Sequence, residues 1–225
     1  NRKFKVSDVD TSFKNLFNDF YELNNYGKNT IKKNFKFIKT YCYHARDNGI
    51  EVNPSLKKLS ISGEDTNDTY LTLDELETIK SYSGLSERLD NVRDWLLISC
   101  FTAQRISDFS RFGKDMIIEV KDQKLISFKQ TKGQKEIVIP LLPEVQQVLN
   151  KRGGEFPRKI SDQRFNEYVK ELCKIIGFTQ EIEGSVVKNI GDEKNKMFRK
   201  VKGSYPKYML VSSHIGRRSF ATNFY

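Results

Sequence analysis

The spacing of apolar residues changes twice along this chain, and that change limits the folds it can adopt. Before residue 102, apolar residues recur every three or four positions, which is typical of amphipathic helices. Between residues 116 and 141 they form three short runs rich in β-branched residues, and after Pro143 the helical spacing returns. We therefore expect a mainly α fold with a small three-stranded antiparallel sheet (α+β).

Caps and turn residues delimit the expected elements. Strands are expected at 116–120, 125–129 and 136–141, and a hairpin within the basic, irregular residues 178–210. Helices are expected after Asp10-Thr11-Ser12, from Thr30 to Gly49, after the capping box Thr72–Glu75 with Leu73, Leu76 and Ile79 inward, from about Ser86 to Phe101, from Pro143 to Gly153, from Ser161 to Gly177, and after Ser212-Ser213.

The net charge of +10 is unevenly distributed. Residues 1–60 carry 12 Lys or Arg against 6 Asp or Glu, residues 61–120 carry 6 against 12, and residues 121–225 carry 21 against 11. A basic protein can bind a polyanion, but charge alone leaves a nucleic-acid partner an open alternative. Two basic blocks around an acidic one suggest two surfaces that face the same polyanion.

Composition also bounds the domain organisation and the cellular compartment. Pro54 and the polar residues 60–68 are typical of a linker, so we expect a helical domain at residues 1–65 and a second domain at residues 66–225. The cysteines are odd in number and lie in apolar helical stretches, which predicts buried free thiols in a reducing compartment: Cys42, Cys100 and Cys173. The sequence contains no run of a membrane helix's length and no CxxC or HExxH motif.

Two short stretches place a cation at a change of element. Arg105, in Thr102-Ala103-Gln104-Arg105-Ile106-Ser107-Asp108, lies where one helix ends and another begins, and a guanidinium beside backbone N–H groups can bind a phosphate. Lys132 lies at the tip between two strands, from which it can donate a proton to a leaving oxygen. Taken singly, an ordinary surface arginine and a polar hairpin tip remain the simpler interpretations.

A third stretch, His214-Ile215-Gly216-Arg217-Arg218, is expected on the last helix. His214 and Arg217 are three residues apart and share one face, so both can address one phosphate. Histidine is also the side chain best suited to proton transfer near neutral pH. The other histidine, His44, has no such companions and is expected to be a structural or surface residue.

Together these stretches resemble the tyrosine recombinase (phage integrase) family over nearly the whole chain. Arg105 with Asp108 matches the family's T-G-x-R-x-S-E/D stretch, Lys132 in Q-T-K-G-Q-K-E-I-V-I-P matches its hairpin lysine, and His214 with Arg217 matches its H-x-x-R. The order and the surrounding elements also agree. The flanking I-V-I-P-L and S-S-H-I-G-R-R-S-F-A-T-N are similar to integrases of mobile elements such as transposons in Bacteroidetes-type bacteria.

The chain departs from the family pattern in three places. Ala103 stands where the family has Gly, which a turn tolerates if φ stays negative. The family's second His or Trp and its nucleophilic Tyr follow H-x-x-R at a greater distance than the eight residues between Arg217 and Tyr225. The nucleophile is therefore expected outside this chain, Tyr225 is expected to be a core aromatic, and the chain is expected to be inactive alone. The N-terminal side supplies fewer helices than the family's core-binding domain.

The resemblance implies the following organisation and chemistry. Residues 1–65 would be a partial core-binding (SAM-like helical) domain, and residues 66–225 a catalytic domain that ends before the nucleophile. A Tyr hydroxyl attacks the scissile phosphate and forms a 3′-phosphotyrosyl link without metal or other cofactor. Arg105 and Arg217 would stabilise the phosphorane, Lys132 would protonate the leaving 5′-oxygen, and His214 would assist the nucleophile. Asp108 would orient a neighbouring group by hydrogen bonding.

The implied partner is duplex DNA carrying a specific recombination site. A dimer or tetramer on DNA, a directionality or host DNA-bending factor and a cytoplasmic location at the bacterial nucleoid are also implied. Lys32, Lys36 and Lys39 lie on a different arc of their helix from its apolar residues, and either contact phosphates or form a solvated polar face. A non-catalytic DNA-binding protein on the same scaffold and a type IB topoisomerase are the alternative functions.

We expect the chain to bind duplex DNA with an affinity that falls steeply as salt rises. Each phosphate that a cation neutralises adds about 0.9 to the slope of log affinity against log salt. Replacing Lys32, Lys36 and Lys39 together with Ala should therefore flatten the slope, as measured by fluorescence anisotropy over a salt series. An unchanged slope would show that this helix faces away from DNA.

Overall fold

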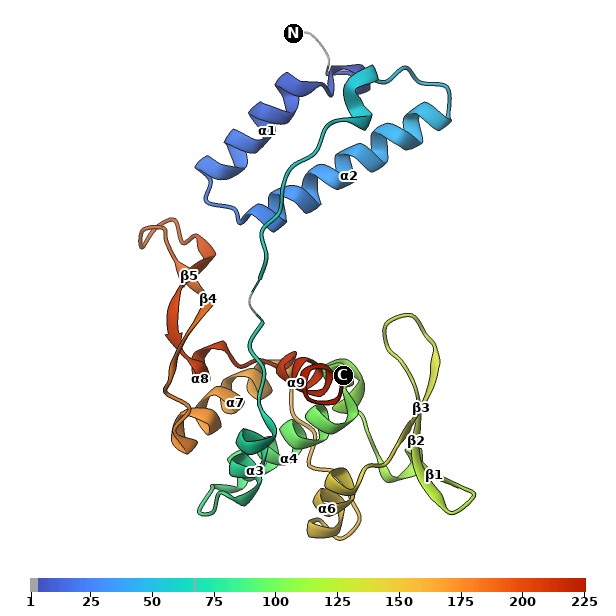
Figure 1. Ribbon diagram of the computed structural model, residues 1–225, viewed down its shortest axis with the longest axis vertical. Helices are drawn as coiled ribbons and strands as arrows, with labels where there is room; N and C mark the ends of the chain where they lie inside the picture. Colours follow the sequence, from blue (N-terminus) through green and yellow to red (C-terminus); the bar gives the residue numbers. More distant parts are fainter. Residues whose placement is uncertain (1–3, 67) are drawn as a thin grey trace. The chain divides into compact units, whose positions relative to one another are not determined.

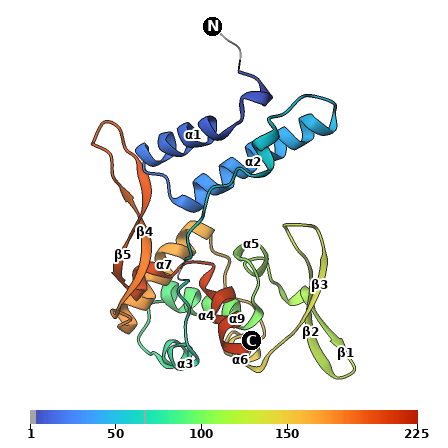
Figure 2. The ribbon, with the colours of Figure 1, turned by 45° about the horizontal axis from the view of Figure 1, so that its top comes forward.

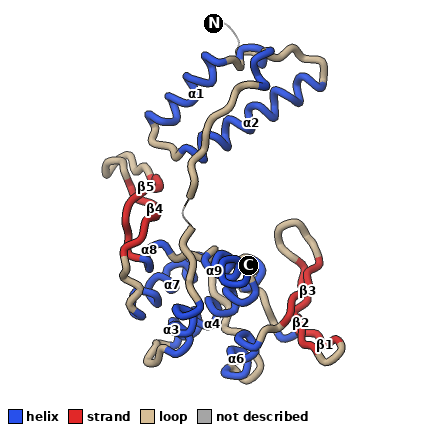
Figure 3. The backbone as a smooth tube through the Cα atoms, viewed as in Figure 1, coloured by secondary structure: helices blue, strands red, loops and turns tan. Residues whose placement is uncertain are grey.

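The computed structural model describes residues 4–66 and 68–225 (Figures 1 and 3). The chain divides into two compact units, residues 1–66 with 186–201, and residues 67–185 with 202–225. The assignment of residues 1–65 and 66–225 to two functional domains stays a prediction. Residues 1–3 and 67 of these ranges lie outside the described part. Residues 186–201 group with the N-terminal residues, which the sequence did not indicate.

The N-terminal unit is built on two helices, α1 (Thr11–Leu23) and α2 (Lys28–Asp47), with 3₁₀ turns at Val6–Asp8 and Pro54–Lys57. Asp10 caps α1 by accepting a hydrogen bond from the Phe13 N–H at 2.8 Å. The small core consists of Val9, Phe35, Cys42, Leu56 and Leu59, with Phe13 and Phe17 packed against it. The expected start of α2 at Thr30 is wrong: the Thr30 N–H donates to the Gly27 carbonyl, so Gly27 is the cap.

The expected hairpin within residues 178–210 is confirmed as β4 (Glu181–Asn189) paired with β5 (Phe198–Pro206). Its outer part, residues 186–201, belongs to the N-terminal unit. There the Arg199 Nε donates to the Asn24 carbonyl at 3.2 Å, and the guanidinium lies 4.2 Å from the Tyr26 ring centroid. A cation stacked on an aromatic ring is attracted by the negative face of the ring.

The second unit is mainly helical and carries the three-stranded sheet, as the sequence predicts. Residues Ile117↔Ile126 and Ile126↔Ile139 are antiparallel partners, so the strands run in the order β1-β2-β3. Its elements are α3 (Leu73–Ser81), α4 (Glu87–Thr102), α5 (Ile106–Phe109), η3 (Lys114–Met116), β1 (Ile117–Val120), β2 (Gln123–Lys129), β3 (Glu136–Pro140), α6 (Pro143–Lys151), α7 (Asp162–Ile176), α8 (Lys207–Leu210) and α9 (Ile215–Phe224).

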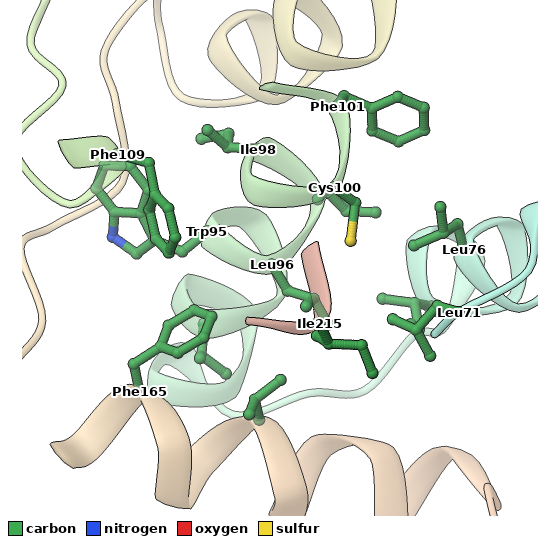
Figure 4. Close-up of a cluster of buried hydrophobic side chains, with 14 of the residues drawn as sticks. Leu71, Leu76, Trp95, Leu96, Ile98, Cys100, Phe101, Phe109, Phe165 and Ile215 are labelled. Atoms are coloured by element: carbon green, nitrogen blue, oxygen red, sulfur yellow. The ribbon is translucent and has the colours of Figure 1, made fainter. Parts of the chain in front are cut away.

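The core of this unit surrounds α4, of whose 16 residues 12 are buried. A helix that is buried on all sides must be covered by several partners, and α4 packs against α6, α7 and α9. Figure 4 shows Trp95 beside Phe109 and Leu96 beside Ile215 in this core. The Trp95 Nε1–H is satisfied by the Arg158 carbonyl at 3.0 Å. The three cysteines are buried and free, as expected.

Helix α9 approaches α4 at a glycine. A Cβ added to Gly216 would lie 2.2 Å from the Ser99 Oγ and 2.7 Å from the Ser99 carbonyl carbon. Contacts this short do not occur between real atoms, so only glycine fits at this crossing. The close approach fixes the helix that carries Arg217.

Helix α9 is also hydrogen-bonded to the segment that leads into α3. The Ser219 Oγ accepts from the Leu71 N–H at 2.9 Å, and the Asn223 Nδ2 donates to the Leu71 carbonyl at 2.9 Å. Arg218 pairs with Asp68 at 2.8 Å. Residues 68–71 are thereby held along α9 at two positions.

Three further sequence predictions in this unit are wrong. Leu73 is 51% exposed, because Leu71 fills the core at this end of α3 and is fully buried. Helix α9 is preceded by His214 as its N-cap and not by Ser213, whose N–H donates instead to the Asn166 Oδ1 on α7. Tyr225 is fully exposed and is not a core aromatic. Over the described residues, no helix is both long and apolar enough to cross a bilayer.

We expect Gly216→Ala to lower the free energy of unfolding by about 1–3 kcal/mol, the typical cost of overpacking. Unfolding in urea can be followed by the fluorescence of Trp95, the one tryptophan of the sequence. Thr222→Ala, on the exposed face of the same helix, is the control and should change stability by less than about 0.5 kcal/mol. Equal stabilities of the two variants would show that α9 does not pack this closely.

Candidate functional site

The first site segment lies between α4 and α5. Arg105 is the N-cap residue of α5 and is half-buried. Its guanidinium has no hydrogen bond or ion pair with any other described residue, so its five donors can bind an anion. Helix α5 has only four residues, so the guanidinium and not the helix end supplies the positive charge here.

Ala103 shapes this segment, and the condition for a turn to tolerate alanine there, a negative φ, is not met. Its φ is +55° and its ψ 20°, in the left-handed region, where it ends α4 as the C-cap. The turn has to reverse direction within two residues to bring Arg105 back toward α4. Alanine there costs about 1–2 kcal/mol relative to a relaxed backbone.

Arg217 joins Arg105 at this turn. The Arg217 Nη1 donates to the Ala103 carbonyl at 2.7 Å, two residues before Arg105. The pKa of the Arg217 guanidinium is lowered, first by burial and then by the positive charge of Arg105, while Asp108 partly opposes the shift. The structure therefore brings two guanidiniums and one carboxylate into electrostatic contact.

His214 lies at the N-terminal end of α9, three residues before Arg217, and its side chain is exposed. Its backbone carbonyl accepts from the Arg218 N–H at 3.3 Å, which continues the helix. An exposed imidazole on the same helix end as a half-buried arginine can reach a ligand that the arginine binds. The second histidine, His44, is exposed on α2, in agreement with a surface residue.

Asp108 connects the arginine segment to the β2–β3 hairpin. Its side chain is fully buried, and its Oδ1 accepts from the Thr131 N–H at 2.8 Å. The Thr131 Oγ1 in turn donates to the Ser107 carbonyl at 3.0 Å. Figure 2 shows α5 beside this hairpin. The Asp108 Oδ2 has no hydrogen-bond partner among the described residues, although it is buried.

Lys132 follows Thr131 directly and is exposed at the turn. The turn is closed by a hydrogen bond from the Gln130 N–H to the Lys135 carbonyl at 2.9 Å, with Gly133 and Gln134 at positive φ. The start of this turn is thus fixed to α5 at Thr131, while the Lys132 side chain has no hydrogen bond or ion pair to another described residue. Lys132 is attached to the site through its neighbour and does not contact the arginines in this structure.

The three lysines predicted to contact DNA lie on α2 and differ in their surroundings. Lys32 and Lys36 are exposed. Lys39 is half-buried, and its ammonium donates to the Leu59 carbonyl at 2.5 Å. Contact with DNA stays a prediction for all three, and Lys39 also holds the segment after α2 in place.

Sequence reasoning missed two residues that hold the hairpin. The Arg111 Nη2 donates to the Lys129 carbonyl at 2.9 Å and lies 3.4 Å from the Asp108 Oδ1. Thr131 makes the two bonds to Ser107 and Asp108 described above. Thr131 adjoins Lys132 in the Q-T-K-G stretch, which was the available signal. Nothing in the sequence marks Arg111.

Solved structures with this fold were found, although no protein-family model and no curated protein matches the sequence. The Tn1549 transposon integrase in complex with transposon right end DNA is 14% identical, with a TM-score of 0.62 over 98% of this chain and 74% of that one. A lambda integrase dimer bound to a COC′ core site is 16% identical, with a TM-score of 0.54 over 78% of this chain. A second dimer, formed by a shorter lambda integrase and also bound to a COC′ core site, is 14% identical, with a TM-score of 0.62 over the whole of this chain.

The chain has the fold of the tyrosine-type integrases. The resemblance drawn from the three motifs is therefore confirmed for the fold, including the small sheet beside the helical core. At these identities the likeness extends to the fold alone. The chain spans 53% of the lambda integrase chain in the first of the two dimers, about half its length.

We expect Ala103→Gly to stabilise the second unit by roughly 0.5–1 kcal/mol. Glycine removes the left-handed strain of about 1–2 kcal/mol but loosens the unfolded chain by about 0.4–1 kcal/mol. Urea unfolding followed by Trp95 fluorescence measures the difference. Ala221→Gly, in the exposed part of α9, is the control of opposite sign and should lower stability by about 0.5–1 kcal/mol. A destabilised Ala103→Gly variant would contradict the left-handed turn.

Proposed function

We propose that this chain cuts and rejoins DNA strands in site-specific recombination or integration. The observation that carries the proposal is the meeting of Arg105 and Arg217 at the Ala103 turn, where the charge of one lowers the pKa of the other. Two like charges held close together, whose repulsion Asp108 offsets only in part, favour the binding of an anion. A phosphate of the DNA backbone is the anion that fits this role, given the fold.

The chemistry would proceed through a 3′-phosphotyrosyl intermediate. A tyrosine hydroxyl from outside residues 1–225 would attack the scissile phosphate, and the 5′-oxygen would leave. Arg105 and Arg217 would neutralise the charge that gathers on the non-bridging oxygens of the phosphorane. Losing one such donor typically costs about 10²–10³ in rate.

Proton transfer would be shared between the two exposed groups. Lys132, on the turn next to the fixed residue Thr131, would protonate the leaving 5′-oxygen, and His214 would take the proton of the nucleophile. Asp108 would act through its bond to the Thr131 N–H, which sets the position of the residue before Lys132. It is thus a positioning residue that touches neither the nucleophile nor the leaving group.

The partner would be duplex DNA with a specific recombination site, held by the lysines of α2 and by the arginine site. The structures of the two integrases named above contain DNA, and those of lambda integrase are dimers. By analogy with these structures, we propose that this chain acts as a dimer or tetramer on DNA. A directionality or host DNA-bending factor belongs to the same proposal.

The strand-joining step can be tested without the tyrosine, with a probe that mimics the 3′-phosphotyrosyl intermediate. The probe is a nicked duplex, selected from a random pool for binding to the chain, with a 3′ p-nitrophenyl phosphate and a free 5′-hydroxyl at the nick. The 5′-hydroxyl attacks phosphorus, its proton passes to Lys132, the bond to the aryl oxygen breaks, and p-nitrophenolate leaves. We expect strand joining, visible by denaturing electrophoresis, which Arg105→Ala or Arg217→Ala slows by about 10²–10³.

Arg218→Ala is the matched control, because Arg218 is adjacent to Arg217 but forms a partly exposed pair with Asp68 and should affect joining little. His214→Ala should cost more with a phenyl than with a p-nitrophenyl ester, because plain phenolate needs a proton to leave. Joining that is insensitive to both site arginines would refute the site. Binding without joining would favour the non-catalytic DNA-binding protein. Joining at any nick, without preference for the selected sequence, would favour a type IB topoisomerase.

A further inference from the structure

Two large aromatic side chains on α2 are exposed although the rest of its aromatic residues are not. Phe37 is 52% and Tyr41 74% exposed, whereas Phe35 is buried and Tyr43 packs against the small N-terminal core. Phe37 and Tyr41 are four residues apart, so they lie one above the other on one edge of the helix. Single exposed hydrophobic residues are common, so this pair points to a ligand only if its surroundings do.

The surroundings of the pair are strongly cationic. From Lys28 to Arg46 the helix carries six Lys or Arg residues and no carboxylate, with the first acid at Asp47. Lys33, one turn before Phe37, lies with its ammonium 5.8 Å from the Phe37 ring centroid. Lys32 and Lys36 are exposed on the adjoining arc. An apolar edge bordered by cations and by no carboxylate up to Asp47 matches a surface that combines phosphates with an apolar group.

We propose that Phe37 and Tyr41 contact thymine methyl groups in the major groove of duplex DNA, while Lys32, Lys33 and Lys36 contact the flanking phosphates. The proposal rests on the proposed function, since it takes duplex DNA as the partner, and it adds which residues read the sequence. The major groove admits an α-helix, and the thymine C5-methyl is the one apolar group on its base edges. The phenyl ring of Phe37 has no hydrogen-bonding group, so a methyl is the feature it can distinguish.

The spacing of the two rings suits bases that are two steps apart on one strand. Four residues of an α-helix rise about 6 Å. Two base-pair steps of a DNA strand rise about 6.8 Å. Phe37 and Tyr41 can therefore contact two thymines of one site, whereas the Tyr41 hydroxyl remains able to bond a base edge or phosphate. The site that this helix prefers should contain closely spaced thymines.

The test compares duplex pools that differ only in the methyl group. Two pools of random-sequence duplexes are prepared from one library, one with thymine and one with uracil, and the affinity of the full chain for each is measured at several salt concentrations. We expect the chain to bind the thymine pool about fourfold to fifteenfold more tightly, the range for one or two buried methyl groups. Phe37→Ala should remove most of this ratio without changing the salt slope.

Two variants separate the apolar contact from charge and from folding. Phe37→Leu should retain part of the thymine preference, because an apolar side chain is kept, and Lys36→Ala should flatten the salt slope while leaving the thymine-to-uracil ratio unchanged. Phe20→Ala is the matched control, since Phe20 is a 61% exposed aromatic on the neighbouring helix α1 and should alter neither quantity. Circular dichroism confirms that each variant keeps its helices.

The outcomes distinguish this inference from the function on which it rests. If the chain binds duplex DNA with a normal salt slope but the thymine-to-uracil ratio is one, or is unchanged by Phe37→Ala, the base contact is wrong and DNA binding stands. If no duplex binds at any salt, both fail. If Phe37→Ala changes only the oligomeric state in sedimentation, the exposed pair is a contact between copies of the chain, and the inference is overturned.

Discussion

Burial of α4 on every side is the constraint on which the second unit depends. A helix without a solvent face cannot be held by one neighbour, so α6, α7 and α9 must all reach it, and each must have a matching surface. Where space is least, Gly216 replaces a side chain. Polar groups that enter are paired, either within the helix, as the Thr102 Oγ1 is with the Ile98 carbonyl, or with a neighbouring helix, as Asp94 is with Lys151. The site is formed where this helix ends.

The same burial explains how two arginines can be held near each other. Arg217 is fixed by a backbone carbonyl at the end of α4, and Arg105 follows the same turn, so neither position is set by an opposite charge. The pKa of Arg217 is lowered first by burial and then by the charge of Arg105. Asp108 offsets part of this shift, although its buried Oδ1 also accepts a hydrogen bond from Thr131.

Local patterns made most of the fold predictable. The change of apolar spacing located the sheet, and the capping box at Thr72 and Glu75 formed as expected, because both depend on residues close in sequence. The predicted burial of Leu73 and the predicted cap of α9 were wrong, because both depend on tertiary contacts. Packing against the rest of the core decides that Leu71 and not Leu73 is buried. Asn166, distant in sequence from α9, decides where Ser213 bonds. The positive φ of Ala103 could not be predicted, because tertiary packing overrides the local preference of alanine for a negative φ.

The residues of the candidate site were likewise only partly predictable from the sequence. Arg105, His214 and Arg217 could be named from motifs whose order along the chain is preserved, but the bonds that join them could not. Arg111 and the second role of Lys39 depend on carbonyl groups 18 and 20 residues away, and nothing in a local pattern reports such a bond. Residues that hold a site are therefore harder to find from sequence than residues that could react in it.

The bonds between α9 and the segment at residues 68–71 have a mechanical consequence. This segment is where the chain enters the second unit, so a load applied to the chain there is borne first by the pair of Arg218 with Asp68. Behind it lie the two bonds of Leu71, to Ser219 and Asn223, which are shielded from water or partly so. Tension on the connecting chain is thus delivered to the helix of Arg217 before it reaches any other element.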